Sequence, residues 1–122
     1  MSDLTVETAD VEDVTVLYPH GFINAHTVRA FDAAIQKAVS RGRFRIVVNC
    51  EGLTYIASAG LGAMMGAIEE IRGSGGDLRL ASLNETVNNI FEILGFNHLY
   101  RTYVSEAEAI GSFRGEGGQA AS

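Results

Sequence analysis

Hydrophobic positions along the chain change period several times, and each change marks a predicted element. Residues 4–9 and 14–18 are rich in β-branched side chains and flank an acidic turn at residues 10–13, which predicts an antiparallel pair of strands. Pro19 lacks a backbone N–H and is expected to limit this ladder. The extended segment is predicted to resume at residues 21–23.

A helical period follows directly. Asn24 is a candidate N-cap, because its side chain can accept hydrogen bonds from the first amides of a helix. Gly42 is expected to end this helix. The apolar face is predicted to contain Val28, Phe31, Ile35 and either Ala38 or Val39.

Residues 44–50 form a near-continuous apolar run, which is typical of a central strand covered on both faces. This strand leads to the segment LTYIASAGLGAMMG at residues 53–66. Ser58 precedes apolar residues at helical spacing, and we interpret it as the N-cap of a second helix, with an outward-facing hydroxyl at the positive end of that helix. The first turns also contain small residues that would let another backbone approach closely, namely Ala59, Gly60, Gly62, Ala63, Gly66 and Ala67. The pattern fits equally well an ordinary helix packed on a sheet, in which Ser58 is a plain cap.

The last third of the chain repeats this alternation. Glycine-rich residues 73–76 break the pattern, and residues 78–81 follow as the next predicted strand. Asn84 is predicted to cap a third helix, and Gly95 to close it. The apolar face of the third helix is predicted to contain Val87, Ile90, Phe91 and Leu94.

The C-terminal part is predicted to add two short elements. Residues 100–104 are expected to form an edge strand, and Ser105 with Glu108 fits the capping box of a short last helix. Residues 111–122 are rich in glycine and are expected to form a flexible tail. Residues 1–110 would then form one domain.

Alternating strands and helices predict an α/β fold with right-handed crossovers. In this arrangement Ser58 lies at the carboxyl end of a strand, where α/β sheets usually place their sites. We expect a single hydrophobic core made of Val28, Phe31, Ile35, Ile46, Val48, Leu61, Ile68, Leu78, Leu80, Ile90, Phe91 and Leu94.

Composition narrows the choice of partners. The chain has 122 residues, of which 47% are hydrophobic, enough for one domain with a real core. Its net charge of −6 and pI near 4.9 argue against nucleic acid as a ligand, since phosphate binding requires a basic surface. The one basic cluster is expected to complement the dipole of the first helix and consists of Lys37, Arg41, Arg43 and Arg45. An anion site at this cluster is the alternative.

Cysteine usage and hydropathy indicate a cytoplasmic setting. The single cysteine, Cys50, stands in an apolar strand and is expected to be a small buried residue. No signal-peptide pattern is present at residues 1–5. The longest uncharged run, residues 52–68, is too short and too rich in glycine to span a bilayer. We therefore expect no direct membrane insertion.

The sequence disfavours enzymatic chemistry. Ser58, Asp77 and His98 occur in the chain order of an α/β-hydrolase triad, but Ile56 stands where a nucleophile elbow needs a very small residue. The three histidines show no metal-ligand spacing, and no P-loop lysine follows the glycines. We expect no enzymatic activity, no metal and no cofactor.

Residues 55–62, YIASAGLG, resemble the signature of STAS domains in the anti-sigma factor antagonist family. The resemblance extends over residues 14–110. It implies a small mixed sheet of four to five strands flanked by about four helices. It also implies that Ser58, at the start of the second helix, is a phosphorylation site.

The same resemblance implies a function. Unphosphorylated antagonists of this family sequester an anti-sigma factor that has serine kinase activity, and a serine phosphatase restores the binding form. The protein is then a substrate of its own partner. Residues expected to bind that partner are Asn24, Ala57, Ser58, Ala59, Gly60, Gly62 and Ala63.

Three positions depart from the family pattern. Ala57 replaces the Asp or Ser that many relatives carry before the phosphoacceptor, and Asn24 and Asn49 stand where aspartates are frequent. Lost acidic groups are expected to weaken kinase engagement without removing the acceptor hydroxyl. The alternative function is a constitutive protein-binding STAS module, as in stressosome-like scaffolds or the cytoplasmic component of a lipid transporter.

Overall fold

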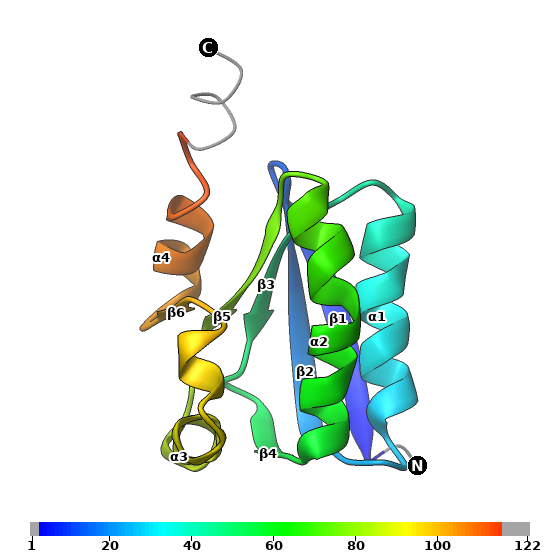
Figure 1. Ribbon diagram of the computed structural model, residues 1–122, viewed down its shortest axis with the longest axis vertical. Coiled ribbons are helices and arrows are strands. Elements are labelled where there is room, and N and C mark those ends of the chain that lie inside the picture. Colours follow the sequence, from blue (N-terminus) through cyan, green and yellow to red (C-terminus); the bar gives the residue numbers. More distant parts are fainter. Residues whose placement is uncertain (1–2, 116–122) are drawn as a thin grey trace.

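The computed structural model describes residues 3–115 and confirms a mixed α/β fold (Figure 1). The path through the sheet is β1 (Leu4–Val11), β2 (Val14–Ile23), β3 (Arg45–Asn49), β5 (Asp77–Ala81) and β6 (Thr102–Tyr103), while β4 (Leu53–Ile56) pairs with β2. The helices are α1 (Val28–Ser40), α2 (Ser58–Gly73), α3 (Glu85–Leu94), α4 (Glu106–Gly111) and the 3₁₀-helix η1 (Phe96–His98). Among the strands of the described chain, β1 and β2 form an antiparallel pair, and the other pairs are parallel.

Within residues 3–115 the sheet has six strands, one more than the upper end of the expected four to five, because residues 53–56 form β4. Strand β2 is continuous through Pro19. Along one side it pairs in parallel with two different strands. Its residues 14–17 pair with β3, and its residues 21–23 pair with β4. Pro19 falls in the gap between these partners, where a missing N–H leaves no ladder position empty.

Helix α1 begins later than predicted. Asn24 does not cap it; the Asn24 Oδ1 accepts hydrogen bonds from the backbone amides of His26 (2.9 Å) and Thr27 (3.1 Å). The Thr27 hydroxyl donates to the carbonyl of Phe22 at 2.8 Å. These bonds stabilise a turn over residues 24–27, and the helix starts only at Val28.

The caps of the two later helices are confirmed. The Asn84 side chain accepts a hydrogen bond from the Val87 amide at 2.9 Å, and Gly95 ends α3 in the left-handed region at φ +76°. The Ser105 hydroxyl accepts from the Glu108 amide at 3.1 Å. Side-chain caps depend on contacts within one turn, which explains why the sequence alone predicted them.

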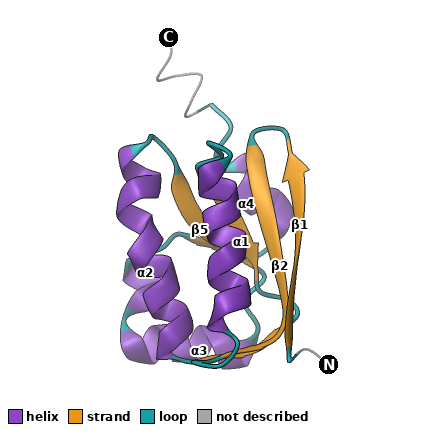
Figure 2. Cartoon of the chain, turned by 90° about the vertical axis from the view of Figure 1, so that its right-hand side faces the viewer, coloured by secondary structure: helices purple, strands orange, loops and turns teal. Residues whose placement is uncertain are grey.

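The hydrophobic core is divided by the sheet into two clusters. The larger lies under α1, α2 and α3, which cover one face (Figures 1 and 2). The smaller lies on the opposite face beneath α4 and contains Val14, Val16, Val47, Ala81, Ala109, Ile110 and Phe113. The predicted single core is therefore incomplete, because it included none of these seven residues.

Leu94 was wrongly assigned to the core, since half of its surface is exposed (50%). The chain turns at Gly95 directly after it, and Phe96 from η1 packs against the larger cluster instead. The ring of Phe96 stacks with the ring of Tyr100, at a centroid distance of 6.5 Å. Leu94 consequently lies at the end of its helix without a place in the interior.

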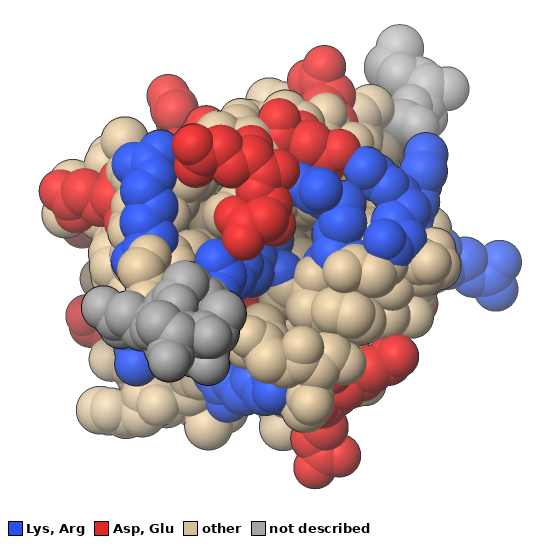
Figure 3. All heavy atoms as spheres, turned by 90° about the horizontal axis from the view of Figure 1, so that it is seen from above, with Lys and Arg blue, Asp and Glu red and all other residues tan. Residues whose placement is uncertain are grey.

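Lys37 of the basic cluster lies in the last turn of α1, as expected, whereas the three arginines form ion pairs with acidic residues. Arg41 and Arg43 form ion pairs with Asp10, at 2.5 and 3.3 Å, and Arg45 pairs with Asp13 at 2.8 Å. The hydrogen bond from Arg41 lowers the pKa of the Asp10 carboxyl. Acidic and basic side chains accordingly lie next to each other at this end of the molecule (Figure 3). These ion pairs connect the end of β1 and the β1–β2 turn to residues 41–45, which lead from α1 into β3.

The C-terminal tail does not begin at Gly111 as expected. Gly111 is the last residue of α4, and Phe113 is buried between two arginines. The Arg79 guanidinium carbon lies 4.0 Å from the centroid of the Phe113 ring, and that of Arg45 lies 5.7 Å away. The rest of the predicted tail, residues 116–122, lies outside the described residues.

Candidate functional site

The first turn of α2 and the β2–α1 turn lie at one corner of the sheet. Ile23, at the end of β2, pairs with Ile56, at the end of β4. The Ala57 amide then donates to the Ile23 carbonyl at 2.8 Å. Because the two strands are parallel and end together, Asn24 and Ser58 are brought to the same edge.

Ser58 is exposed and is the first residue of α2. The N-cap is Ala57, which has extended backbone angles and a carbonyl that accepts a hydrogen bond from the Gly60 amide at 2.9 Å. The interpretation of Ser58 as the N-cap is therefore wrong by one position. Its hydroxyl is not used to cap the helix, and it lies beside backbone amides that have no partner within the helix.

The small residues of α2 have two different roles. Gly60 is buried, and a Cβ there would lie 2.7 Å from Ile23 Cγ2 and 2.8 Å from Ile56 Cγ1. A side chain at Gly60 would push the helix away from β2 and β4. Gly62 and Gly66 are exposed, with open space where a Cβ would stand, so their lack of a side chain shapes the outer surface.

A hollow of about 370 Å³ lies on that outer surface, between α1 and α2. Val28, Arg29, Asp32 and Gln36 of α1 face Ala59, Gly62, Ala63 and Gly66 of α2 across it. Met65 on α2 is also half exposed (49%). Three of the residues predicted to bind a partner, Ala59, Gly62 and Ala63, line this hollow. Asn24, Ala57 and Ser58 are not among its lining residues, and Gly60 is buried.

Asn49 lies elsewhere, at the end of β3. Its Nδ2 donates to Glu106 Oε1 of α4 at 3.1 Å, and its Oδ1 accepts from the Glu51 amide at 2.9 Å. Asn49 therefore connects the sheet to α4 and contributes nothing to the surface around Ser58. No local sequence signal indicates this contact, because Glu106 is far away along the chain.

The groups of the rejected hydrolase triad are not assembled. Ser58 begins α2, whereas Asp77 pairs with Arg72, near the opposite end of that helix, at 2.9 Å. Sixteen helical residues span about 24 Å. Asp77 consequently lies too far from Ser58 to act with it in the activation of a serine nucleophile.

The described residues offer neither a cluster of metal-binding side chains nor a reactive cysteine. Residues 3–115 contain no group of three or more His, Cys, Asp or Glu side chains able to hold a metal ion. Cys50 is buried, and burial raises the pKa of its thiol to about 12, so at neutral pH it is a packed thiol instead of a reactive thiolate. None of the helices in residues 3–115 combines the length and apolar character that crossing a bilayer requires.

Known proteins are similar to this chain in sequence and in fold. BtrV of Bordetella bronchiseptica, named as an anti-sigma factor antagonist, is 27% identical over 104 residues, which cover 85% of this chain and 90% of BtrV. The structure of the anti-sigma factor antagonist SpoIIAA in its unphosphorylated form matches with a TM-score of 0.78 at 26% identity, covering 91% of this chain and 97% of SpoIIAA. The phosphorylated form of Bacillus SpoIIAA matches with a TM-score of 0.68 at 25% identity, covering 91% and 99%. Residues 5–109 match the STAS domain model, and the chain therefore belongs to the STAS domain family.

Proposed function

We propose that this protein is an anti-sigma factor antagonist and that phosphorylation of Ser58 switches its binding. The partner is an anti-sigma factor with serine kinase activity, which the unphosphorylated protein sequesters. The observation that carries this proposal is the exposed position of Ser58 at the first turn of α2, beside the hollow between α1 and α2. Relatives named as anti-sigma factor antagonists support it, as does the existence of SpoIIAA in phosphorylated and unphosphorylated forms.

The contact surface consists of the outer side of α2 and the adjoining turn at Asn24. Gly62 and Gly66 leave open space, so a partner can approach the helix backbone closely. Ala57, Ala59 and Ala63 are half-buried and contribute apolar area without long side chains. Binding to this surface therefore requires little ordering of side chains in the antagonist.

A phosphate on Ser58 would have opposite effects on the free protein and on the complex. It adds about −1.5 to −2 charges and three acceptor oxygens at neutral pH. The first turn of α2 contains no acidic residue, and the helix N-terminus favours a negative group, so the free protein tolerates it. At a closely packed interface the same group imposes steric exclusion and desolvation, and a serine phosphatase would restore the binding form.

Capture of the partner from native lysate tests the proposal. The wild-type protein and S58A should retain a kinase that phosphorylates the wild-type chain but not S58A. S58D, a partial mimic with fewer charges and acceptors than phosphate, should retain at least about tenfold less, a difference of about 1.4 kcal/mol. S74D is the matched control, because Ser74 is an exposed residue at the other end of α2, and its binding should equal that of the wild type.

Two results would overturn the switch. Equal capture by the fully phosphorylated Ser58 form would instead support a constitutive STAS binding module. Mass spectrometry of the protein from its own cells should find the phosphate on Ser58. Phosphate on Ser40 or Ser82 in its place would show that the regulated site lies elsewhere.

A further inference from the structure

We propose that two copies of this chain associate through the outer edge of β1, so that the sheet continues across a two-fold axis at Thr8. Strand β1 has eight residues and ends the path of the sheet on one side. Within residues 3–115 no strand pairs with its outer edge, and Figure 2 shows β1 at the border of the sheet. This inference is independent of the function proposed for Ser58.

Alternate residues of β1 turn their backbone groups toward this outer edge. The amide of Phe22 donates to the Asp3 carbonyl at 3.4 Å. The amide of Gly21, which is opposite Leu4, points away from β1 and donates to the Gly52 carbonyl at 3.1 Å. Because backbone hydrogen bonds alternate along an antiparallel pair, the odd-numbered residues of β1 bond to β2. The amides and carbonyls of its even-numbered residues therefore face outward.

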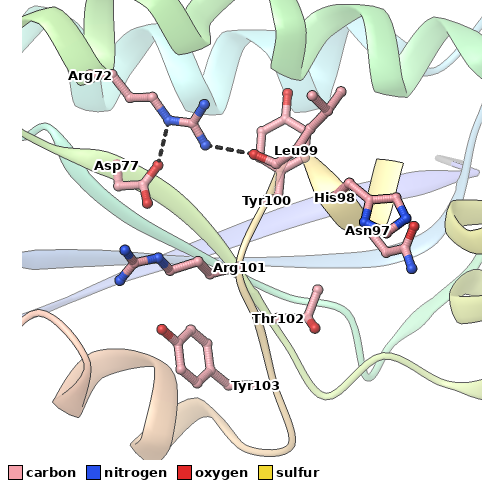
Figure 4. A pocket seen from close by; sticks show the side chains of 9 residues that line it. All are labelled: Arg72, Asp77, Asn97, His98, Leu99, Tyr100, Arg101, Thr102 and Tyr103. Carbon is pink, nitrogen blue, oxygen red and sulfur yellow. Dashed lines mark hydrogen bonds and ion pairs between the residues drawn. The ribbon is translucent and has the colours of Figure 1, made fainter. Parts of the chain in front are cut away.

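The edge of β1 lacks most of the features that prevent strands from pairing. Residues Leu4–Val11 contain no proline, lysine or arginine, and their register with β2 runs without a bulge. Natural proteins protect edges with such features or with very short strands. The outer strand on the other side, β6, has only two residues. The chain that leads into β6 is held to α2, because Arg72 donates to the Leu99 carbonyl at 2.6 Å (Figure 4). Association through β1 is therefore favoured over association through β6.

The charges on β1 select one register for the pairing of two copies. With the axis at the exposed residue Thr8, the outward-facing groups of Thr8 meet those of the second Thr8, and Val6 of each copy meets Asp10 of the other. Glu7 of each copy then lies opposite Ala9. An axis at Glu7 would place two like charges directly opposite each other, which is destabilising.

The remaining negative charge of this edge is compensated within each copy. Asp10 forms ion pairs with Arg41 and Arg43. Opposite Val6, its carboxylate therefore needs no partner from the second copy. The Thr8 pair adds a contact between β-branched side chains, which stabilises neighbouring strands.

The helix layer also fits across the axis. Helix α1 contacts both β1 and β2, and neighbouring strands lie about 4.8 Å apart. The two copies of α1 would then lie about 10 Å apart, at the upper end of the range at which helices pack. Helix α2 lies on the other side of α1 (Figure 2), so its outer side stays open in the dimer.

Sedimentation velocity of the full chain between about 5 and 500 μM tests the dimer, because a small edge contact should dissociate in this range. The fraction of dimer should rise with concentration. Amide hydrogen exchange at the two ends of this range should show added protection at Val6, Thr8 and Asp10, but not at Glu7, whose amide faces β2. A monomer at every concentration, or added protection on α2 instead, would overturn the proposal.

Variants at Thr8 separate strand pairing from folding. Thr8→Pro removes an outward-facing amide without taking a donor from the ladder between β1 and β2, and it should raise the dissociation constant of the dimer at least about tenfold. Thr8→Val keeps the amide and should dimerise like the wild type. Unchanged association of the folded Thr8→Pro variant would refute this edge as the interface.

Variants at Ala9 test the register without a proline. Ala9→Lys places a cation opposite Glu7 of the other copy and should strengthen the dimer several-fold, whereas Ala9→Glu should weaken it. Ser74→Lys, at an exposed residue that ends α2, controls for net charge and should leave the dimer unchanged. Equal association of the two Ala9 variants would refute the axis at Thr8.

Discussion

The two faces of the sheet are held by different kinds of interaction. On one face, α1, α2 and α3 bury aliphatic and aromatic side chains against residues such as Ile46 and Val48. On the other, α4 covers a smaller apolar cluster that includes Val47. Polar contacts add to it, with Arg79 stacked on Phe113 and Asn49 donating to Glu106.

This difference bears on the structural role of α2 and on the binding role proposed for it. Its inner side buries Leu61, Met64 and Ile71 in the larger cluster. Its outer side carries Gly62 and Gly66, which contribute little to stability. The apolar burial beneath the three helices stabilises the fold. The residues on the outer side of α2 are therefore not needed for stability and are available for the proposed contact with a partner.

Replacing a buried aromatic residue on each face of the sheet by alanine is expected to change the free energy of unfolding most. Phe91→Ala should lower the free energy of unfolding by roughly 3 to 5 kcal/mol, because it removes a buried ring from the larger cluster. Phe113→Ala should lower it less, because short α4 can separate from the sheet without unfolding the rest. Urea titration and amide exchange measure both effects. A loss below about 1 kcal/mol for Phe91→Ala would contradict the conclusion that the larger cluster supplies most of the stability.

Removing a carboxylate should distinguish buried from exposed ion pairs. Asp77→Ala takes away the partner of Arg79, whose side chain is 3% exposed, and should reduce stability by roughly 3 kcal/mol, the lower end of the range for breaking a buried pair. Asp13→Ala breaks a pair in which the Asp13 side chain is 66% exposed, and it should change stability by about 0.2 to 1 kcal/mol. Similar losses in thermal unfolding for both variants would argue against a structural role for the Asp77 pairs.

Stability should fall as pH rises from about 9 toward 12, with a contribution from each face. Burial raises the pKa of Cys50, in the three-helix face, to about 12. Burial and then the hydrogen bond with Glu106 raise the pKa of Tyr18, beside α4, to about 12. The unfolded chain loses these protons near pH 9 and 10, so rising pH favours unfolding.

Urea midpoints at about pH 8 and pH 11 measure this loss. Cys50→Ala should remove the part that comes from the three-helix face, and Tyr18→Phe the part that comes from the α4 face. A pH dependence that both substitutions leave intact would show that other groups cause it.

The smallest expected changes in stability come from introducing a negative charge at either end of α2. Ser58→Asp places a negative charge at the N-terminus of the helix and should raise stability by about 0.3 to 1 kcal/mol. Ser74→Asp, at the C-terminal end, should lower it by a similar amount. Precise thermal melts at low salt can resolve these shifts. Equal signs for both variants would show that the helix dipole does not control these positions.

Elements that depend on neighbouring residues were predictable from the sequence. The apolar face of α1, the Asn84 cap and the Gly95 end of α3 all follow from spacing within a few turns. Even β3 was evident, because a central strand covered on both faces has a continuous apolar sequence. The signature around Ser58 likewise indicated the family before the structure was known.

Features that depend on distant partners were not predictable. The pairing of β4 with β2 and the ion pairs between the basic cluster and the β1–β2 turn connect segments that lie far apart along the chain. The second cluster beneath α4 was missed because alternate residues of the apolar strands face opposite sides. The sequence did not indicate either that Phe113, which follows α4, is buried in this cluster.

The sequence by itself determined where strands and helices form, because local hydrogen bonding and the period of apolar residues act over a few positions. It also determined that Ser58 begins a helix built from small residues. Only the tertiary structure decided which of these residues face outward, since Gly60 packs against Ile23 and Ile56 while Gly62 remains open. The physical reason is that the two glycines are chemically identical. Only the elements packed around each of them make one buried and the other accessible.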